Sequence, residues 1–414
     1  STPLLEQFRL LGDNTIFERI TSIGEDGNQL PPLSGDSGTL QTVLALVKSF
    51  VGVAVTFMPL GFYEGGWVFS SVALLLIGAS NAVCIWMIVD CRIKTGAPDF
   101  GEIATLAAGT PGRLAVQISL VVSQFGTCIS YVIFVNKVVA SVFPTPSLNI
   151  AAAQLVALVP LGMIRSIHGL EYPNLLADAL LIFGIVVIVW YNARVLREDG
   201  LSPSMEMFRP RSCGLFIGTA VFAFEGIPLM LPVRNAMREP DRFMPLFLSV
   251  LTGAVLLNVF FGLLGYADYG STVQETALNN LPVGDVLANS VKVAYCIALM
   301  AGMPLMFIPA ARIVEFWIFG STGKGARKWC KNAVRACEIV LFAVIAVVGG
   351  SAFDKFLAFV GAVCCTPIAY IYPSWFHLRL CAQSVFAKSM DIFFVLLGVA
   401  AMVFVLGQVL MGSA

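Results

Sequence analysis

The sequence predicts an all-α polytopic membrane protein built as an inverted repeat of five plus five helices with an eleventh transmembrane helix. Its composition is 58% hydrophobic and only 12% charged, with a mean hydropathy of +0.86, whereas soluble domains are nearer a quarter charged. Long apolar segments recur along the chain, and two of them are interrupted at matching positions. The net charge of zero and the absence of basic patches with interleaved aromatic residues give no support for nucleic-acid binding.

Residues 1–38 differ from the rest of the chain. They are polar and acid-rich and contain Pro31 and Pro32. No basic region precedes a short apolar core, so the segment does not read as a signal peptide. We expect a flexible N-terminal tail.

A bilayer-crossing helix needs about 20 mostly apolar residues. The segments that meet this requirement are 41–63, 67–91, 113–142, 149–168, 173–192, 213–235, 243–266, 286–317, 332–352, 355–378 and 390–411. The predicted division is a ten-helix core at 39–380, with halves at 39–195 and 212–380, followed by the eleventh helix within 386–414. The polar stretch 99–109 is too short to span and is expected to lie along the interface.

Lysine and arginine in the loops orient these spans, because cytoplasmic loops are enriched in both. With the tail on the cytoplasmic side, seventeen of these residues fall on that side and five on the other. The sequence therefore predicts a cytoplasmic tail and a C-terminus on the opposite, lumenal or external, side.

Two apolar segments carry helix-breaking residues in corresponding places. GVAVTFMP at 52–59 aligns with EGIPLMLP at 225–232, and each opens one five-span half. Such pairs are typical of inverted-repeat secondary transporters, whose freed backbone N–H and C=O groups bind charged groups of the substrate. A carboxylate and an ammonium on one zwitterion fit two such breaks. The alternative is that glycine and proline merely kink these helices.

Several motifs carry a family resemblance: KSFVGVAVTFMPLGFYEGG (48–66), VVSQFGTCISYVIF (121–134), IRSIHGLEYPNLLADALLIFG (164–184), FAFEGIPLMLPVRNAM (222–237), PLMFIPAARIVE (304–315) and CCTPIAYIYP (364–373). They resemble the amino acid/auxin permease family, and the first is most similar to fungal vacuolar amino-acid transporters. The resemblance implies a LeuT-like fold and amino-acid transport by alternating access. The absence of N-x-[ST] sequons from the predicted non-cytoplasmic loops adds to the expectation of a vacuolar or lysosome-like membrane.

The candidate substrate site follows from the breaks and from this resemblance. The family's first-span signature is glycine-threonine-glycine, of which Gly52 is kept, while Val53 and Ala54 are expected to contribute backbone groups. Glu225 and Gly226 form the second break. Further candidates are aromatic residues expected to form pocket walls or simply to pack between helices: Tyr131, Phe222 and Phe224.

The coupling ion is predicted to be a proton. The eighth span, 293–310, contains no serine or threonine, and sodium requires oxygen ligands. Proton coupling or plain facilitated diffusion remains. Glu225 is a candidate proton carrier and a candidate helix cap, and the two roles are compatible. Asp178 is a second carrier candidate that alternatively pairs with Lys48 or faces an aqueous vestibule. No charged residue is evident beside the site, which favours neutral amino acids.

Other functional classes have less support. A sensor that signals through the acidic tail is the main alternative to a transporter. The ten cysteines lack CxxC spacing and only His168 and His377 accompany them, so no metal or cofactor is expected. No nucleophile–base pair is evident either, which argues against an enzyme. The expected partners are an amino acid, a proton and the lipid bilayer.

Overall fold

The computed structural model describes residues 38–50, 52–143, 145–165, 171–224, 226–282, 284–320 and 327–411. It leaves the side chains of Val53, 171–175, Arg327 and Ser351 undescribed. The predicted tail, except for Gly38, and Glu225 lie outside these residues. The elements in chain order are α3 (Thr39–Phe50), η1 (Val53–Phe57), α4 (Met58–Gly65), α5 (Trp67–Thr95), α6 (Phe100–Val142), α7 (Ser147–Gly162), α8 (Glu171–Asp199), α9 (Cys213–Ala223), η3 (Ile227–Leu229), α10 (Met230–Ala236), η4 (Pro240–Arg242), α11 (Phe243–Tyr269), η5 (Gly270–Thr272), η6 (Ala277–Asn280), α12 (Val286–Phe319), α13 (Arg327–Gly349), η7 (Gly350–Ala352), α14 (Phe353–Val360), η8 (Gly361–Cys365), η9 (Pro367–Ile371), α15 (Tyr372–Leu380) and α16 (Val385–Met411).

The membrane-spanning architecture agrees with the prediction. Within the described residues, ten helical segments are long and apolar enough to cross a bilayer. The fourth predicted span, 149–168, corresponds to α7, an apolar helix of only 16 residues that ends at Gly162. The described part of the chain forms helices, turns and loops without a strand, as predicted for this fold class.

The third span contains the short helix that the sequence predicted before it. Asp99 caps α6 at its N-terminus by accepting a hydrogen bond from the Glu102 backbone N–H at 2.9 Å. Gly109 then interrupts the helix with φ 66° and ψ −161°, a conformation that L-residues avoid. The stretch 99–109 is therefore a separate helical segment joined to the long third span at a glycine kink.

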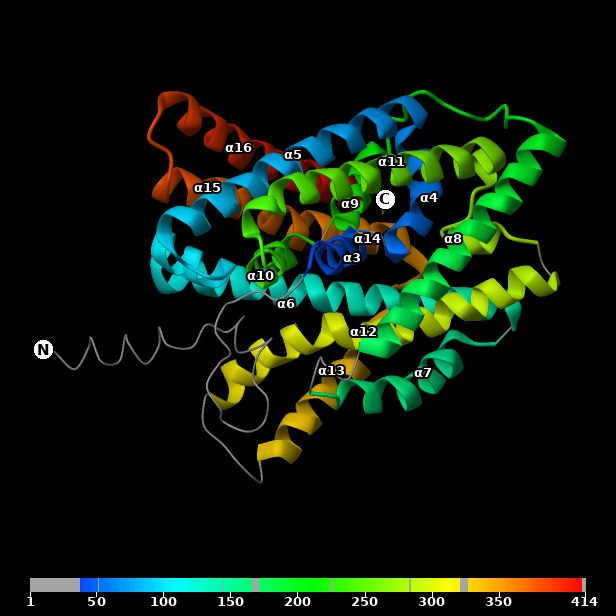
Figure 1. Ribbon diagram of the computed structural model, residues 1–414. Helices are drawn as coiled ribbons and strands as arrows, with labels where there is room; N and C mark the ends of the chain where they lie inside the picture. The colour runs from blue at the N-terminus through cyan, green and yellow to red at the C-terminus, as the bar shows by residue number, and fades with distance from the viewer. Residues whose placement is uncertain are drawn as a thin grey trace, which may run out of the picture.

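The bundle places equivalent helices of the two halves together. α6 and α12, the third helix of each half, pack against each other, and α8 packs against α12. α7 and α13 lie together at one edge of the bundle, and α15 and α16 lie at the opposite edge (Figure 1). The interrupted segments α3–α4 and α9–α10 occupy the centre, where every freed backbone group must be lined by protein.

A buried arginine completes the C-terminal end of α7. Arg335 of α13 is only 1% exposed, and its Nε donates to Glu315 at 2.6 Å. Its Nη1 donates to the carbonyl oxygens of Gly162 at 3.0 Å and Ile164 at 3.1 Å. Helix ends leave carbonyl groups without intrahelical partners. Arg335 supplies donors for these carbonyls, and Glu315 balances its charge.

The tenth span is not a regular α-helix. Its middle consists of the π-helical stretches η8 and η9, between α14 and α15. A Cβ added to Gly218 of α9 would lie 2.6 Å from the Ala358 Cα, and a Cβ on Gly361 would lie 2.8 Å from the Gly218 carbonyl carbon. Only glycines permit this approach. π-helical turns often occur at functional sites, and this one touches the helix that leads into the second break.

Candidate functional site

Both predicted helix interruptions are present. α3 ends at Phe50, and helical structure resumes as η1 at Val53; Gly52 between them is extended, with φ −136° and ψ −151°. α9 ends at Ala223, and η3 begins at Ile227. The interruption at the second break falls on Phe224–Gly226, and Glu225 itself lies outside the described residues. The helices are therefore interrupted at the positions that the glycine and proline residues predicted.

The two interruptions lie against each other. A Cβ added to Gly226 would come within 2.8 Å of the Ser49 Cβ, in the last turn of α3. The rings of Phe50 and Phe224, which flank the two breaks, have centroids 6.3 Å apart. Gly226 is thus required for close contact rather than for an unusual dihedral angle, and the breaks form one site instead of two.

Aromatic side chains surround the first break. Phe57 of η1 contacts Phe134 of α6 with a centroid distance of 5.9 Å and Phe353 of α14 with a distance of 5.1 Å. Phe57 and Phe134 are almost completely buried. Ala54 is also buried, whereas Gly52 is partly open and a Cβ on it would meet no described atom within 4 Å. Sequence reasoning missed Phe57, Phe134 and Phe353, because their importance depends on which helices meet at the break.

The three aromatic residues predicted from the sequence to line the site lie in two different places in the structure. Phe222 and Phe224 are buried at the end of α9, and the Phe222 backbone nitrogen lies 3.2 Å from a Cβ built on Gly361. Tyr131 instead borders a hollow between α6, α7 and α12, together with Gln154 and Met303. Of Tyr131 and Phe134 on α6, it is Phe134 that contacts Phe57 at the first break.

Asp178 pairs with Lys48, which is one of the alternatives left open by the sequence. The Lys48 Nζ of α3 lies 3.1 Å from Asp178 Oδ2 of α8, and the side chains are 28% and 36% exposed. The pair joins the last turn of the first half-helix, beside the first break, to the fifth span.

The other end of the first interrupted helix is covered by a segment that we call the cap, residues 200–212. Its backbone pairs with the turn between α4 and α5: Trp67 N–H donates to the Glu206 carbonyl at 3.0 Å, and Arg209 N–H donates to the Gly65 carbonyl at 3.0 Å. Gly66 has φ +85°, and a Cβ on it would lie 2.7 Å from the Met207 carbonyl carbon. The cap therefore needs glycine at this turn.

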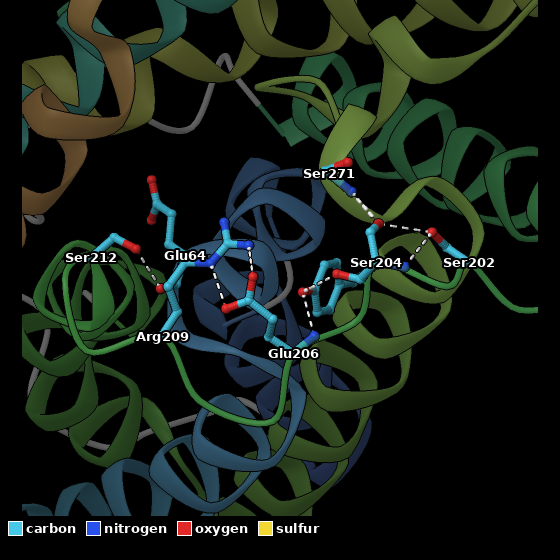
Figure 2. Close-up of polar contacts among 8 residues, drawn as sticks. Glu64, Ser202, Ser204, Glu206, Arg209, Ser212 and Ser271 are labelled. Carbon is cyan, nitrogen blue, oxygen red and sulfur yellow. Dashed lines mark hydrogen bonds and ion pairs between the residues drawn. The ribbon is translucent and has the colours of Figure 1, made fainter.

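Side chains fasten the cap further (Figure 2). Ser212 Oγ donates to the Glu64 carbonyl at 2.7 Å, and the Glu206 N–H donates to the Tyr266 hydroxyl at 3.0 Å. Ser204 Oγ accepts from the Ser271 N–H at 2.9 Å. These contacts join the cap to α4 and to the end of α11.

One ion pair dominates the electrostatics of the cap. Arg209 donates to both carboxylate oxygens of Glu206, at 2.5 and 3.2 Å, and its guanidinium carbon lies 3.9 Å from the centroid of the Tyr63 ring. The hydrogen bond from Arg209 lowers the pKa of Glu206, and Glu206 in turn raises the pKa of Arg209. Both groups consequently stay charged in moderately acidic solution.

Glu64 is a buried carboxyl that the sequence reading did not assign. It sits in the last turn of α4 and is 5% exposed. Its carboxylate points away from Arg209 and Ser212 (Figure 2). A carboxyl in a membrane span is energetically costly, and such residues usually serve a function. The sequence showed this glutamate within GFYEGG, but attention went to the helix-breaking motif beside it.

Metal binding finds no support in the described part of the chain. There, no three His, Cys, Asp or Glu side chains cluster as a metal ion would require. The site offers backbone groups, aromatic rings and isolated carboxyls instead, which suits a small organic ion.

Comparisons with known proteins agree with this geometry. A family profile described as "Transmembrane amino acid transporter protein" matches residues 35–411. "Vacuolar amino acid transporter 3" of Schizosaccharomyces pombe is 34% identical over 380 residues, covering 89% of this chain and 58% of the relative. The Saccharomyces cerevisiae protein of the same name is 33% identical, covering 89% and 56%. The chain thus spans little more than half the length of these relatives.

A plant relative and two solved structures extend the comparison. "Amino acid transporter ANT1" of Arabidopsis thaliana is 27% identical, covering 87% of this chain and 90% of the relative. The inward-facing conformation of Mhp1 matches with a TM-score of 0.56 at 13% identity, covering 94% of this chain and 96% of the other. MhsT in complex with L-phenylalanine matches with a TM-score of 0.54 at 12% identity, covering 90% and 99%.

These structures share the LeuT-like architecture, so the predicted fold class is confirmed. The family is one of transporters and not of enzymes. Because the family profile matches residues 35–411, the protein belongs to the family of transmembrane amino acid transporter proteins.

Proposed function

We propose that this protein is a secondary transporter that carries amino acids across a vacuolar or lysosome-like membrane by alternating access. The observation that carries the proposal is the meeting of two interrupted helices at the bundle centre, Ser49 against Gly226 and Phe50 beside Phe224. Family membership and the names of the fungal relatives support the substrate class and the membrane.

The backbone at the breaks suits a zwitterion. The first N–H groups of the continuous stretch formed by η1 and α4 point to the interruption, and helix N-termini favour a carboxylate. The last carbonyls of α9, at Phe222 and Ala223, end at the same place and favour an ammonium group. In this proposal Gly52, Val53, Ala54 and Gly226 contribute backbone contacts.

The substrate side chain is proposed to be neutral. The described side chains that flank the breaks are Ser49, Phe50, Ala54, Phe57, Phe222 and Phe224. None of these carries a charge that would pair with a cationic or anionic side chain. Phe222 and Phe224 are proposed to shape this part of the pocket, and Tyr131 is proposed as a more distant wall.

A proton gradient is the proposed driving force. The stretch 293–310 of α12 contains no serine or threonine that would bind sodium, and replacing sodium with choline should leave uptake unchanged. Glu225, at the second break, remains the first candidate carrier. Asp178 is the second, and its carboxylate lies against the Lys48 ammonium.

The test is uptake by the purified protein in liposomes. A panel of radiolabelled amino acids, measured with and without a pH gradient, should show uptake of neutral amino acids that the gradient accelerates. Failure to transport any amino acid would refute the proposal. In the same assay Glu225→Gln should keep exchange of bound amino acid and lose gradient-driven uptake; if it retains gradient-driven uptake, the proton site lies elsewhere.

A further inference from the structure

Four ionisable side chains form a line at the tail-side end of α5, α15 and α16. Asp391 of α16 contacts His377 of α15, with both carboxylate oxygens at 2.8 and 2.9 Å from the imidazole Nδ1. His377 Nε2 lies 3.2 Å from Asp90 Oδ2 of α5, and Lys94 Nζ lies 2.7 Å from the same oxygen. The line joins the second, tenth and eleventh spans.

The line runs from the protein interior to its surface. The side chains of Asp391 and His377 are 0% and 3% exposed, that of Asp90 is 19% exposed and that of Lys94 is 48% exposed. Chains of Asp, Glu and His within membrane helices are the usual components of proton relays. Asp90 therefore lies between His377 and the solvent-exposed Lys94.

The charges of this cluster balance when it carries one proton on the imidazole. With an imidazolium, the two carboxylates and the lysine give a net charge of zero; with a neutral imidazole, one negative charge is left uncompensated. An uncompensated charge in a low-dielectric interior is unfavourable. Among the described residues, the other ionisable groups that interact with this line are the thiols of Cys84, Cys91 and Cys381, which are ordinarily uncharged at neutral pH.

The tenth span connects this cluster with both breaks. At one end Phe353 contacts Phe57 of the first break. In the middle Gly361 touches Gly218 and approaches the Phe222 backbone, just before the second break. His377 lies at the other end of the same span. A displacement of the tenth span against α16 would therefore change the His377 contacts and the substrate site together.

We propose that His377, held between Asp391 and Asp90, is a proton-binding site for the proton that accompanies the amino acid and releases it on the tail side of the membrane. The inference rests on the proposed function. In the release step the N–H bond at His377 Nε2 breaks and an O–H bond forms on Asp90, which then gives the proton to water beside Lys94. Asp391 keeps its hydrogen bond to Nδ1 and positions the ring.

The first experiment compares variants in liposomes, using an amino acid that the wild-type protein transports. His377→Gln and Asp391→Asn remove titration and keep a hydrogen-bonding side chain. We expect gradient-driven uptake to fall by about a hundredfold, the lower end of the range for a lost proton-transfer group, while exchange at equal pH stays close to the wild-type rate. The matched control is Ser374→Ala, which changes a buried neutral residue one turn away on the same helix and should leave both assays unchanged.

A surface variant keeps the proposal testable if the buried variants fail to fold. Lys94→Gln removes a positive charge next to Asp90, so the cluster binds its proton more tightly. The midpoint of the tail-side pH dependence of uptake should shift upward, by roughly one unit or less. An unshifted midpoint would overturn the relay.

The outcomes separate the two proposals. If wild-type uptake responds to the gradient and His377→Gln responds equally, the relay is wrong and proton-coupled transport stands. If wild-type uptake ignores the gradient, proton coupling is refuted, and the role of His377 with it. If no amino acid is transported at all, the proposed function itself fails.

Discussion

The two ends of the interrupted first span are secured in different ways. α4 is covered by the cap, which is held to it by backbone hydrogen bonds, by the Ser212 contact and by Arg209 stacked on Tyr63. At the other end, the described polar contact of α3 with a neighbouring span is the single Lys48–Asp178 pair, and Phe50 adds packing against Phe224 and Phe247. Partly exposed ion pairs contribute little, so we expect α3 to separate from the bundle more easily than α4.

The largest expected effect comes from breaking the cap at its glycine turn. Gly66→Ala would place a side chain at φ +85° and 2.7 Å from Met207 backbone atoms. The dihedral alone costs about 1–3 kcal/mol, and the clash forces the cap away from α4. We predict a severe loss of folded protein, measured by thermal unfolding and size-exclusion chromatography.

A matched control isolates the clash. Gly320, at the end of α12, has a comparable extended conformation at positive φ (φ +65°, ψ −166°, against φ +85° and ψ 150° at Gly66), but a Cβ there would meet no described atom within 4 Å. Gly320→Ala should cost only the dihedral term. Equal destabilisation by the two substitutions would show that the cap is not held tightly against Gly66.

A smaller effect is expected from the cap's ion pair. Arg209→Gln loses the two-oxygen contact with Glu206 and the stacking on Tyr63. We predict a melting temperature about 2 °C lower and greater reactivity of a cysteine introduced in the cap. Arg194→Gln is the control, since its pair with Glu198 is about 60% exposed on both sides, and it should change neither measurement.

The same pair gives the cap a defined response to acid. Because Arg209 lowers the pKa of Glu206 below its ordinary value of 4.5, the pair stabilises the folded protein above that value and is lost as the pH falls through the lowered pKa. The difference in melting temperature between wild type and Arg209→Gln should be constant between pH 7 and about 5 and shrink below about 4.5. A difference that already disappears near pH 6 would contradict this assignment.

The smallest predicted effect concerns the Lys48–Asp178 ion pair. A double-mutant cycle of Lys48→Ala and Asp178→Ala should give a coupling of about 0.2–1 kcal/mol in stability, because both side chains are about a third exposed. The double variant should be no less stable than either single variant. If Asp178→Ala abolishes gradient-driven uptake while Lys48→Ala does not, Asp178 carries a proton and is more than a structural partner.

Local chemistry explains what the sequence predicted well. Helix interruptions follow from glycine and proline within eight residues, so both breaks were predicted at the residues where they occur. Span positions follow from the length of apolar runs. These features depend on neighbouring residues and on the bilayer, and no knowledge of the packing is needed.

Packing explains what the sequence could not predict. The His377–Asp391 contact depends on how α15 and α16 cross, and nothing in the spacing of 14 residues reveals it. Tyr131 and Phe134 are three residues apart on α6, and only the position of the break shows that Phe134 contacts it. The cap residues looked like an ordinary polar loop, because their partners at Gly65 and Gly66 lie far away in the chain.

The arginine-completed end of α7 relates the protein to the thickness of its membrane. Sixteen residues of α-helix span about 24 Å, less than the hydrocarbon core of about 30 Å. Without the guanidinium of Arg335, the last carbonyls of α7 would lack donors close to the lipid. Lipids with shorter acyl chains therefore match the length of α7 best. In a thicker bilayer, either the lipid must thin around α7 or the bundle must tilt.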